Sequence, residues 1–272
     1  MRGNTVQRAM PMIHFFRRYW AANPAALMFI LSFWACATDT LAAELRLAVA
    51  ANFTAPMKTI AAGFEKETGH RLTLTYGSTG KLYAQIKNGA PFDILLAADS
   101  ATPARLVKEG LGVAGTPFTY ATGRLALWST QAGFVDDRGD ILKNGQFNSL
   151  ALASPKLAPY GAAAIETLRS LGLLASLEPK IVLGESIGQT FSFIATGNAQ
   201  LGFVALSQLV QDGKVKAGSA WIVPTKLHSA LNHDAVVLNR GKTLAASAEF
   251  MAYLKRDKTR DIIRSSGYVV GP

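Results

Sequence analysis

The chain has 272 residues, 49% of them hydrophobic, and a formal net charge of +10 at neutral pH. Its basic residues are scattered and form no run interleaved with aromatic side chains, which argues against a nucleic-acid surface. The only cysteine is Cys36, so the chain cannot form an intrachain disulfide and must fold around an apolar core.

Residues 1–43 are typical of a signal peptide. Arg17 and Arg18 precede an apolar run at residues 25–37, and small residues follow at 40–43. The apolar run is shorter than the roughly 20 residues that cross a bilayer. We expect export to the periplasm and cleavage after Ala42 or Ala43, which leaves 229 residues with no cysteine and a net charge of +7 if it follows Ala43.

Strand-like apolar runs alternate with helical patterns in the first part of the remaining chain. We expect strands at residues 45–50, 72–76 and 93–97, and helices at 55–68, through 82–86 to Gly89, and between Ser100 and Gly110. Ser100 is a favourable N-cap for the third helix, and Gly110 favours its end. This βαβαβα order predicts a mainly parallel sheet that helices cover on both faces.

A second alternation begins after an extended segment at residues 118–128. We expect strands at 150–153, 180–183, 201–204 and 220–223, and helices at 162–171, at 189–196 and through 209. A last extended run at 234–238 returns to the first part, and two helices, at 245–255 and 260–265, end the chain.

These elements predict an α/β fold with two lobes. Each lobe would hold a mainly parallel sheet flanked by helices, and two crossing strands would join the lobes. We expect residues 44–122 and 234–272 to form lobe 1 and residues 123–233 to form lobe 2. A ligand would then lie between the lobes, at the carboxyl ends of the strands.

Four short segments of small and polar residues lie where a predicted strand or loop leads into a helix. They are 52–54, 77–80, 159–161 and 186–188. The free backbone N–H groups and the dipole at a helix N-terminus favour an anion. The first three segments contain no Asp or Glu, and Glu185 lies only at the edge of the fourth. Such donors suit a fully deprotonated oxyanion better than phosphate, which carries a proton near neutral pH.

Several motifs in consistent order resemble the periplasmic molybdate-binding proteins of ABC importers. They are Leu-Ala-Val-Ala-Ala-Asn-Phe-Thr from residue 47, Gly-Ser-Thr-Gly-Lys-Leu-Tyr-Ala-Gln-Ile from 77, Leu-Ala-Leu-Ala-Ser-Pro from 150, Pro-Tyr-Gly from 159 and Leu-Gly-Phe-Val from 201. The resemblance implies a type II periplasmic-binding-protein fold and a molybdate or tungstate ligand held without a cofactor. It also implies a monomer that delivers the anion to an inner-membrane ABC permease.

The same resemblance assigns the ligand positions one loop at a time. The first of the four segments, which we call the first loop, offers Asn52, and the second loop, at 77–80, offers the hydroxyl of Thr79, with Ser78 beside it. The third match falls on Tyr160, and the fourth falls on Ile187 through its backbone N–H. These residues would bind the molybdate oxyanion through hydrogen bonds, and none of them would ligate the metal atom directly.

The chain departs from this pattern after the Leu-Gly-Phe-Val strand. Some members carry a tyrosine there, whereas this chain has Ala205. We expect Tyr160 to replace that donor from the opposite loop. Lys81 lies close to the second loop, and we expect it to be a solvated helix residue rather than a direct ligand.

Other functions find less support in the sequence. The chain lacks a Gly-x-Ser-x-Gly motif and the helical metal-binding patterns, so we do not expect an enzyme. His228, His233 and Asp234 form only a weak candidate for a metal site. Two alternatives stay open: a receptor for sulfate or another oxyanion, and a periplasmic ligand-sensing module on the same fold.

Overall fold

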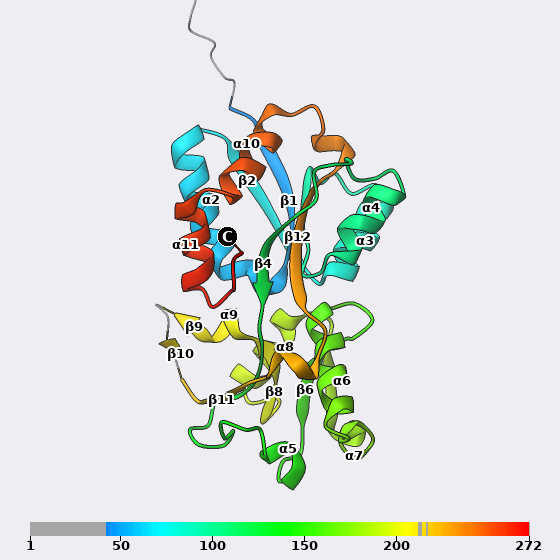
Figure 1. The fold of residues 1–272 in the computed structure, drawn as a ribbon, viewed down its shortest axis with the longest axis vertical. Coiled ribbons are helices and arrows are strands. Elements are labelled where there is room, and N and C mark those ends of the chain that lie inside the picture. Colours follow the sequence, from blue (N-terminus) through cyan, green and yellow to red (C-terminus); the bar gives the residue numbers. More distant parts are fainter. Residues whose placement is uncertain (1–41, 212–213, 216, 272) are drawn as a thin grey trace, which may run out of the picture. The chain divides into compact units, whose positions relative to one another are not determined.

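The computed structural model describes residues 42–211, 214–215 and 217–271 (Figure 1). Cys36 and the predicted signal peptide up to Leu41 lie outside the described residues. Among the helices within these ranges, none is long and apolar enough to cross a membrane.

The first sheet has five strands in the order β2-β1-β3-β12-β4. They are β1 (Glu44–Ala50), β2 (Arg71–Gly77), β3 (Ile94–Leu96), β4 (Phe118–Gly123) and β12 (Leu231–Val237). Strand β1 pairs in parallel with β2 and β3, while β12 pairs antiparallel with β3 and β4. Four of the five strands therefore run in one direction.

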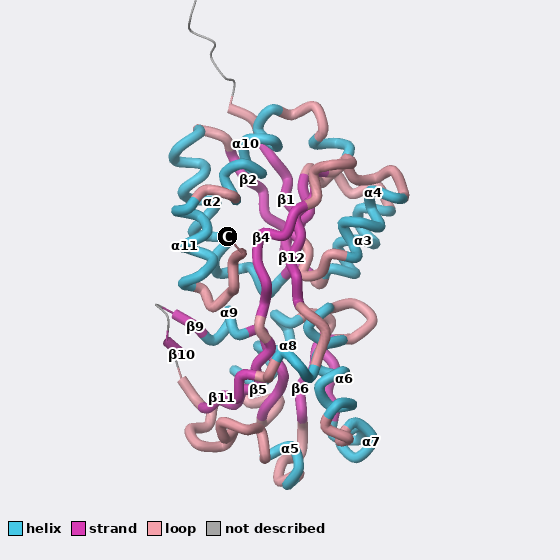
Figure 2. Tube along the Cα trace, in the orientation of Figure 1, coloured by secondary structure: helices cyan, strands magenta, loops and turns pink. Residues whose placement is uncertain are grey.

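Helices cover both faces of this sheet (Figure 2). They are α2 (Thr54–Thr68), α3 (Thr79–Lys87), α4 (Ala101–Lys108), α10 (Ala245–Leu254) and α11 (Asp257–Ser265). Leu47 of β1 packs in one core with Phe64 and Phe250, whereas the next residue, Ala48, packs with Leu82 in a second core. Successive side chains of a strand point to opposite faces, so the two cores lie on opposite sides of the sheet.

The second sheet has the order β11-β5-β8-β6-β7. Its strands are β5 (Leu125–Ser129), β6 (Leu150–Ala153), β7 (Ile181–Gly184), β8 (Leu201–Ala205) and β11 (Ser219–Ile222). Strand β6 is parallel to β7 and β8, and β5 is antiparallel to β8 and β11. Again four strands share one direction.

The remaining elements accompany the second sheet. Its helices are α5 (Ile141–Asn144), α6 (Pro159–Ser170), α7 (Leu174–Leu177), α8 (Ile187–Ala195) and α9 (Leu206–Leu209), and a two-stranded ribbon is formed by β9 (Val210–Gln211) and β10 (Lys214–Val215). Leu168 of α6 packs with Leu152 and Phe203, whereas Ile194 of α8 packs with Trp128 and Val204. These are again two cores on the two faces of one sheet.

The chain crosses between the sheets twice. Only Arg124 separates β4 of the first sheet from β5 of the second, and residues 223–230 lead back from β11 to β12. The prediction of two mainly parallel, helix-flanked sheets joined by two crossing segments is thus confirmed. We call the first sheet with its helices lobe 1 and the second lobe 2. The exact boundaries of lobe 2 at residues 123 and 233 stay a prediction.

One predicted helix cap is wrong. Ser100 occupies the N-cap position of α4, but its side chain caps no backbone N–H. The carboxylate of Asp99 instead accepts from the backbone N–H of Thr102 at 2.6 Å. A carboxylate is a good acceptor for a free N–H at a helix N-terminus.

Candidate functional site

The first loop of the site begins where β1 ends. Residues 51–53 form a single 3-10 turn, and α2 starts directly after it at Thr54. The carbonyl of Ala51 accepts from the Thr54 hydroxyl at 2.8 Å, and the carbonyl of Asn52 accepts from the Tyr268 hydroxyl at 2.8 Å. The N–H of a trans peptide points opposite to its C=O. The amides of Asn52 and Phe53 therefore face away from these donors.

The Asn52 side chain points into lobe 1. Its Nδ2 donates to Tyr268 Oη at 2.9 Å and lies 3.3 Å from His233 Nδ1. An amide nitrogen can only donate, so Nδ1 of His233 accepts and the ring proton is on Nε2. Burial lowers the pKa of His233 to about 3, which keeps this ring neutral near neutral pH. Sequence reasoning missed His233 and Tyr268 as partners of this loop.

The two neighbouring hydroxyls of the second loop have different surroundings. Thr79 Oγ1 accepts from the backbone N–H of Ala98 at 3.0 Å. Ser78 is the N-cap of α3 but makes no side-chain cap bond, and its buried Oγ has no partner among the described residues. Accepting from Ala98 uses only a lone pair of Thr79 Oγ1, so the hydroxyls of both Ser78 and Thr79 keep a proton that can be donated to a ligand.

The third and fourth loops supply helix N-termini from lobe 2. Tyr160 is the second residue of α6, where a backbone N–H has no intrahelical acceptor. Ile187 is the first residue of α8 and has a free N–H for the same reason. Ser186 caps α8 by accepting from the Gln189 N–H at 3.2 Å. Lobe 2 thus offers backbone donors at two positions.

The Tyr160 side chain reaches the crossing segment. Its hydroxyl is buried without a partner among the described residues, and burial raises the pKa of the phenol well above its usual value. A Cβ at Gly123 would lie 2.0 Å from Tyr160 Oη, so this position must be glycine for the ring to fit. Its ring also packs edge-on against His233.

All five residues assigned from the sequence line one cavity. Asn52, Ser78 and Thr79 come from lobe 1, and Tyr160 and Ile187 come from lobe 2. The empty space inside the cavity, part of it open to solvent, is about 200 Å³. No Lys, Arg, Asp or Glu of the described chain lines it. The cavity is suited to one small ligand that accepts hydrogen bonds from neutral donors.

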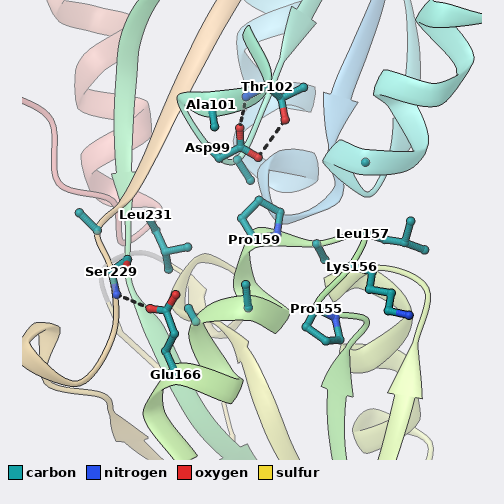
Figure 3. Close-up of a pocket in the computed structure, with 16 residues that line it drawn as sticks. Asp99, Ala101, Thr102, Pro155, Lys156, Leu157, Pro159, Glu166, Ser229 and Leu231 are labelled. Carbon is teal, nitrogen blue, oxygen red and sulfur yellow. Dashed lines mark hydrogen bonds between the residues drawn. The ribbon is translucent and has the colours of Figure 1, made fainter. Parts of the chain in front are cut away.

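A larger pocket lies beside this cavity and shares Ala98, Ala158 and Pro159 with it (Figure 3). Its carboxylates already have partners: Asp99 accepts from Thr102, and Glu166 accepts from the Ser229 N–H at 2.6 Å. Lys156 lines this pocket beside the two acidic side chains, whereas the smaller cavity has no charged side chain among its described lining residues.

Direct contacts join the two lobes around the cavity. The N–H of Gly80 donates to the carbonyl of Leu157 at 2.8 Å, and a Cβ at Gly80 would lie 3.0 Å from the Leu157 backbone. Lys81 Nζ lies 2.6 Å from Glu185 Oε2, and both side chains are exposed. The structure therefore has its lobes closed over the cavity, and it pairs Lys81 with a carboxylate instead of placing it at the cavity wall.

The weak metal-site candidate finds no support in the geometry. Asp234 accepts from the Thr119 hydroxyl at 2.6 Å, and His228 Nδ1 lies 2.7 Å from the Ser229 carbonyl. Within the part of the chain that the structure describes, no three His, Cys, Asp or Glu side chains gather to hold a metal ion.

Comparisons with known proteins place this geometry in a family. A model of the bacterial extracellular solute-binding protein family matches residues 45–269. The molybdate-binding protein ModA of Azotobacter vinelandii is 53% identical over 234 residues, covering 86% of this chain and 92% of that protein. ModA of Rhodobacter capsulatus is 48% identical over 233 residues, covering 86% and 91%.

A solved structure agrees with this relationship. The periplasmic molybdate-binding protein of Azotobacter vinelandii superimposes with a TM-score of 0.82 at 38% identity, covering 84% of this chain and all of that one. The sulfate-binding protein SubI of Mycobacterium tuberculosis, at 13% identity and a TM-score of 0.70, shares the fold alone. The chain belongs to the ModA family of bacterial extracellular solute-binding proteins.

Proposed function

We propose that the protein captures molybdate, and also tungstate, in the periplasm and delivers it to an inner-membrane ABC permease. One observation carries this proposal: five residues from four loops of two lobes line a single small cavity that has neutral donors and no charged side chain. The names of relatives about half identical to this chain support molybdate as the ligand. We propose that it acts as a monomer and is exported by its N-terminal signal peptide.

In the proposed complex, the anion accepts hydrogen bonds from both lobes. Ser78 Oγ and the backbone N–H of Asn52 donate from lobe 1, and the N–H groups of Tyr160 and Ile187 donate from lobe 2. Thr79 Oγ1 accepts from the Ala98 N–H, which holds the second loop in place, and it keeps a proton to donate to the anion. Each hydrogen bond to a charged group contributes about 1.5–3 kcal/mol, and several such bonds must offset the desolvation of a dianion.

The donor set also accounts for which anions the protein would reject. Phosphate carries a proton near neutral pH and needs an acceptor for it, but no carboxylate of the described residues lines the cavity. Sulfate is a deprotonated dianion like molybdate, so only the smaller size of sulfate distinguishes the two. A cavity that closes on molybdate would leave some donors too far from a sulfate oxygen.

Isothermal titration of the exported, dialysed protein tests this function. We expect one-to-one binding of molybdate and tungstate, weak binding of sulfate and no response to phosphate. Tight sulfate binding with weak molybdate binding would favour the alternative oxyanion receptor. Copurification with a sensor kinase instead of a permease would favour a ligand-sensing module.

A further inference from the structure

Helix α9 makes side-chain hydrogen bonds to two loops of the proposed site. Ser207 Oγ donates to the backbone carbonyl of Asn52 at 3.0 Å, and Gln208 Nε2 donates to the backbone carbonyl of Ile187 at 3.1 Å. Gln208 Oε1 accepts from the Ala205 N–H at 2.9 Å, which fixes the orientation of the amide. Two adjacent residues thus contact a ligand loop of each lobe.

The two bonds differ in the lobes that they join. Gln208 links α9 to α8 and β8, so both of its bonds lie within lobe 2. Ser207 is buried and links lobe 2 to the Asn52 loop of lobe 1. A bond between the lobes exists only while they are closed, whereas a bond within one lobe persists when they separate.

The carbonyl of Asn52 has a second donor that provides a natural comparison. Tyr268 Oη donates to the same oxygen at 2.8 Å, and Tyr268 packs in a core of lobe 1. The Tyr268 bond therefore holds the loop in both the open and the closed protein, and the Ser207 bond adds to it on closure.

We infer that Ser207 is a positioning residue that stabilises the closed, anion-bound protein by holding the Asn52 carbonyl from lobe 2. Because the carbonyl of residue 52 and the N–H of residue 53 share one peptide plane, the bond also fixes the direction of the Phe53 amide. The inference rests on the proposed function, since it assumes that the Asn52 loop faces the bound anion.

The rate of molybdate release tests this role. We expect Ser207→Ala to release radiolabelled molybdate roughly two- to tenfold faster, because a neutral hydrogen bond present only in the closed form is lost. The association rate and the melting temperature of the ligand-free protein should change little, since this bond is present only in the closed part of the ligand-free population.

Two variants serve as controls. Tyr268→Phe removes both bonds between the Tyr268 hydroxyl and Asn52 within lobe 1, so it should lower the melting temperature of the ligand-free protein. Ser129→Ala removes a buried serine whose Oγ donates to the Gln200 carbonyl within lobe 2, so it should lower stability and leave release unchanged. Unchanged release in Ser207→Ala, or a ligand-free melting temperature lowered as much as in Tyr268→Phe, would overturn the inference.

A second measurement separates this inference from the choice of ligand. If the unaltered chain binds no molybdate, the proposed function fails, but lobe closure can still be followed by distances between spin labels at the exposed positions 58 and 178. The inference then predicts a larger open population in Ser207→Ala than in the unaltered chain. Equal distance distributions would refute it.

Discussion

The two adjacent hydroxyls of the second loop should respond differently to removal. Ser78 Oγ is buried without a partner among the described residues, whereas Thr79 Oγ1 accepts from the Ala98 N–H. We therefore expect Ser78→Ala to weaken molybdate binding without destabilising the ligand-free protein. Thr79→Val should both weaken binding, because the Thr79 hydroxyl still has a proton to donate, and destabilise the fold.

The expected sizes follow from the lost contacts. Loss of a hydrogen bond to a charged ligand costs about 1.5–3 kcal/mol, so Ser78→Ala should raise the dissociation constant roughly tenfold to 150-fold. Thr79→Val leaves the buried N–H of Ala98 without its acceptor, which costs about 1–3 kcal/mol of unfolding free energy. In a chain of this size each kcal/mol lowers the melting temperature by about 2–4 °C.

Calorimetric titration gives the affinity of each variant, and thermal unfolding without ligand gives its stability. The predicted pattern is a loss of affinity in both variants and a loss of stability in Thr79→Val alone. A large loss of affinity in Thr79→Val with normal binding by Ser78→Ala would refute the assignment of a donor to Ser78.

Three further changes test the lobe contacts and the buried histidine. Gly80→Ala puts a methyl group 3.0 Å from the Leu157 backbone, so the two lobes could no longer close fully. Titration should show binding of molybdate weakened at least about tenfold. Unchanged affinity would contradict the closure of the lobes at this contact. Lys81→Met breaks an exposed ion pair with Glu185 that is worth about 0.2–1 kcal/mol. The affinity for molybdate should therefore change less than about sixfold. A larger loss would indicate that Lys81 contacts the anion directly. Burial lowers the pKa of His233 to about 3 in the folded protein, whereas an unfolded histidine has a pKa of about 6.5. Below pH 6.5 the unfolded chain therefore takes up a proton that the folded protein does not, so the free energy of unfolding is highest above pH 6.5 and falls as the pH drops toward 3. Urea unfolding should lose about 2 kcal/mol from this group between pH 7 and 5, and His233→Asn should lack that loss; an equal loss in both proteins would contradict it.

The order of strands and helices could be predicted because it depends on local patterns. Each buried strand is a short apolar run, and α2 shows its apolar face at regular helical spacing. The apolar pattern alone places the starts of three other helices two or three residues too late, but α3, α6 and α8 begin at Thr79, Pro159 and Ile187, inside the predicted helix entrances 77–80, 159–161 and 186–188. Small residues in these turns hide the helical period, and the same turns line the cavity.

The sequence predicted the loops of the site but not the partners of their side chains. Asn52 contacts His233 and Tyr268, which lie 181 and 216 residues further along the chain. No local pattern relates residues that far apart. The match along the sequence also pointed to Thr79 as a donor, which stays a prediction, and only the fold shows that its hydroxyl also accepts from the Ala98 N–H.

Contacts between side chains of the two lobes could not be predicted from the sequence. Lys81 follows the second loop directly, but its ammonium pairs with Glu185 of lobe 2, 104 residues further along the chain. Ser207 lies in a four-residue helix without an evident motif, and its contact with Asn52 arises only where the two lobes meet.

A crystal structure of the protein grown with molybdate, with anomalous scattering recorded at a molybdenum absorption edge, would test the central claim most directly. We expect a single anomalous peak in the cavity, where the molybdate oxygens lie within hydrogen-bonding distance of Ser78 Oγ and the backbone N–H groups of Tyr160 and Ile187. A peak in the larger pocket near Lys156, or none despite measured binding, would contradict it.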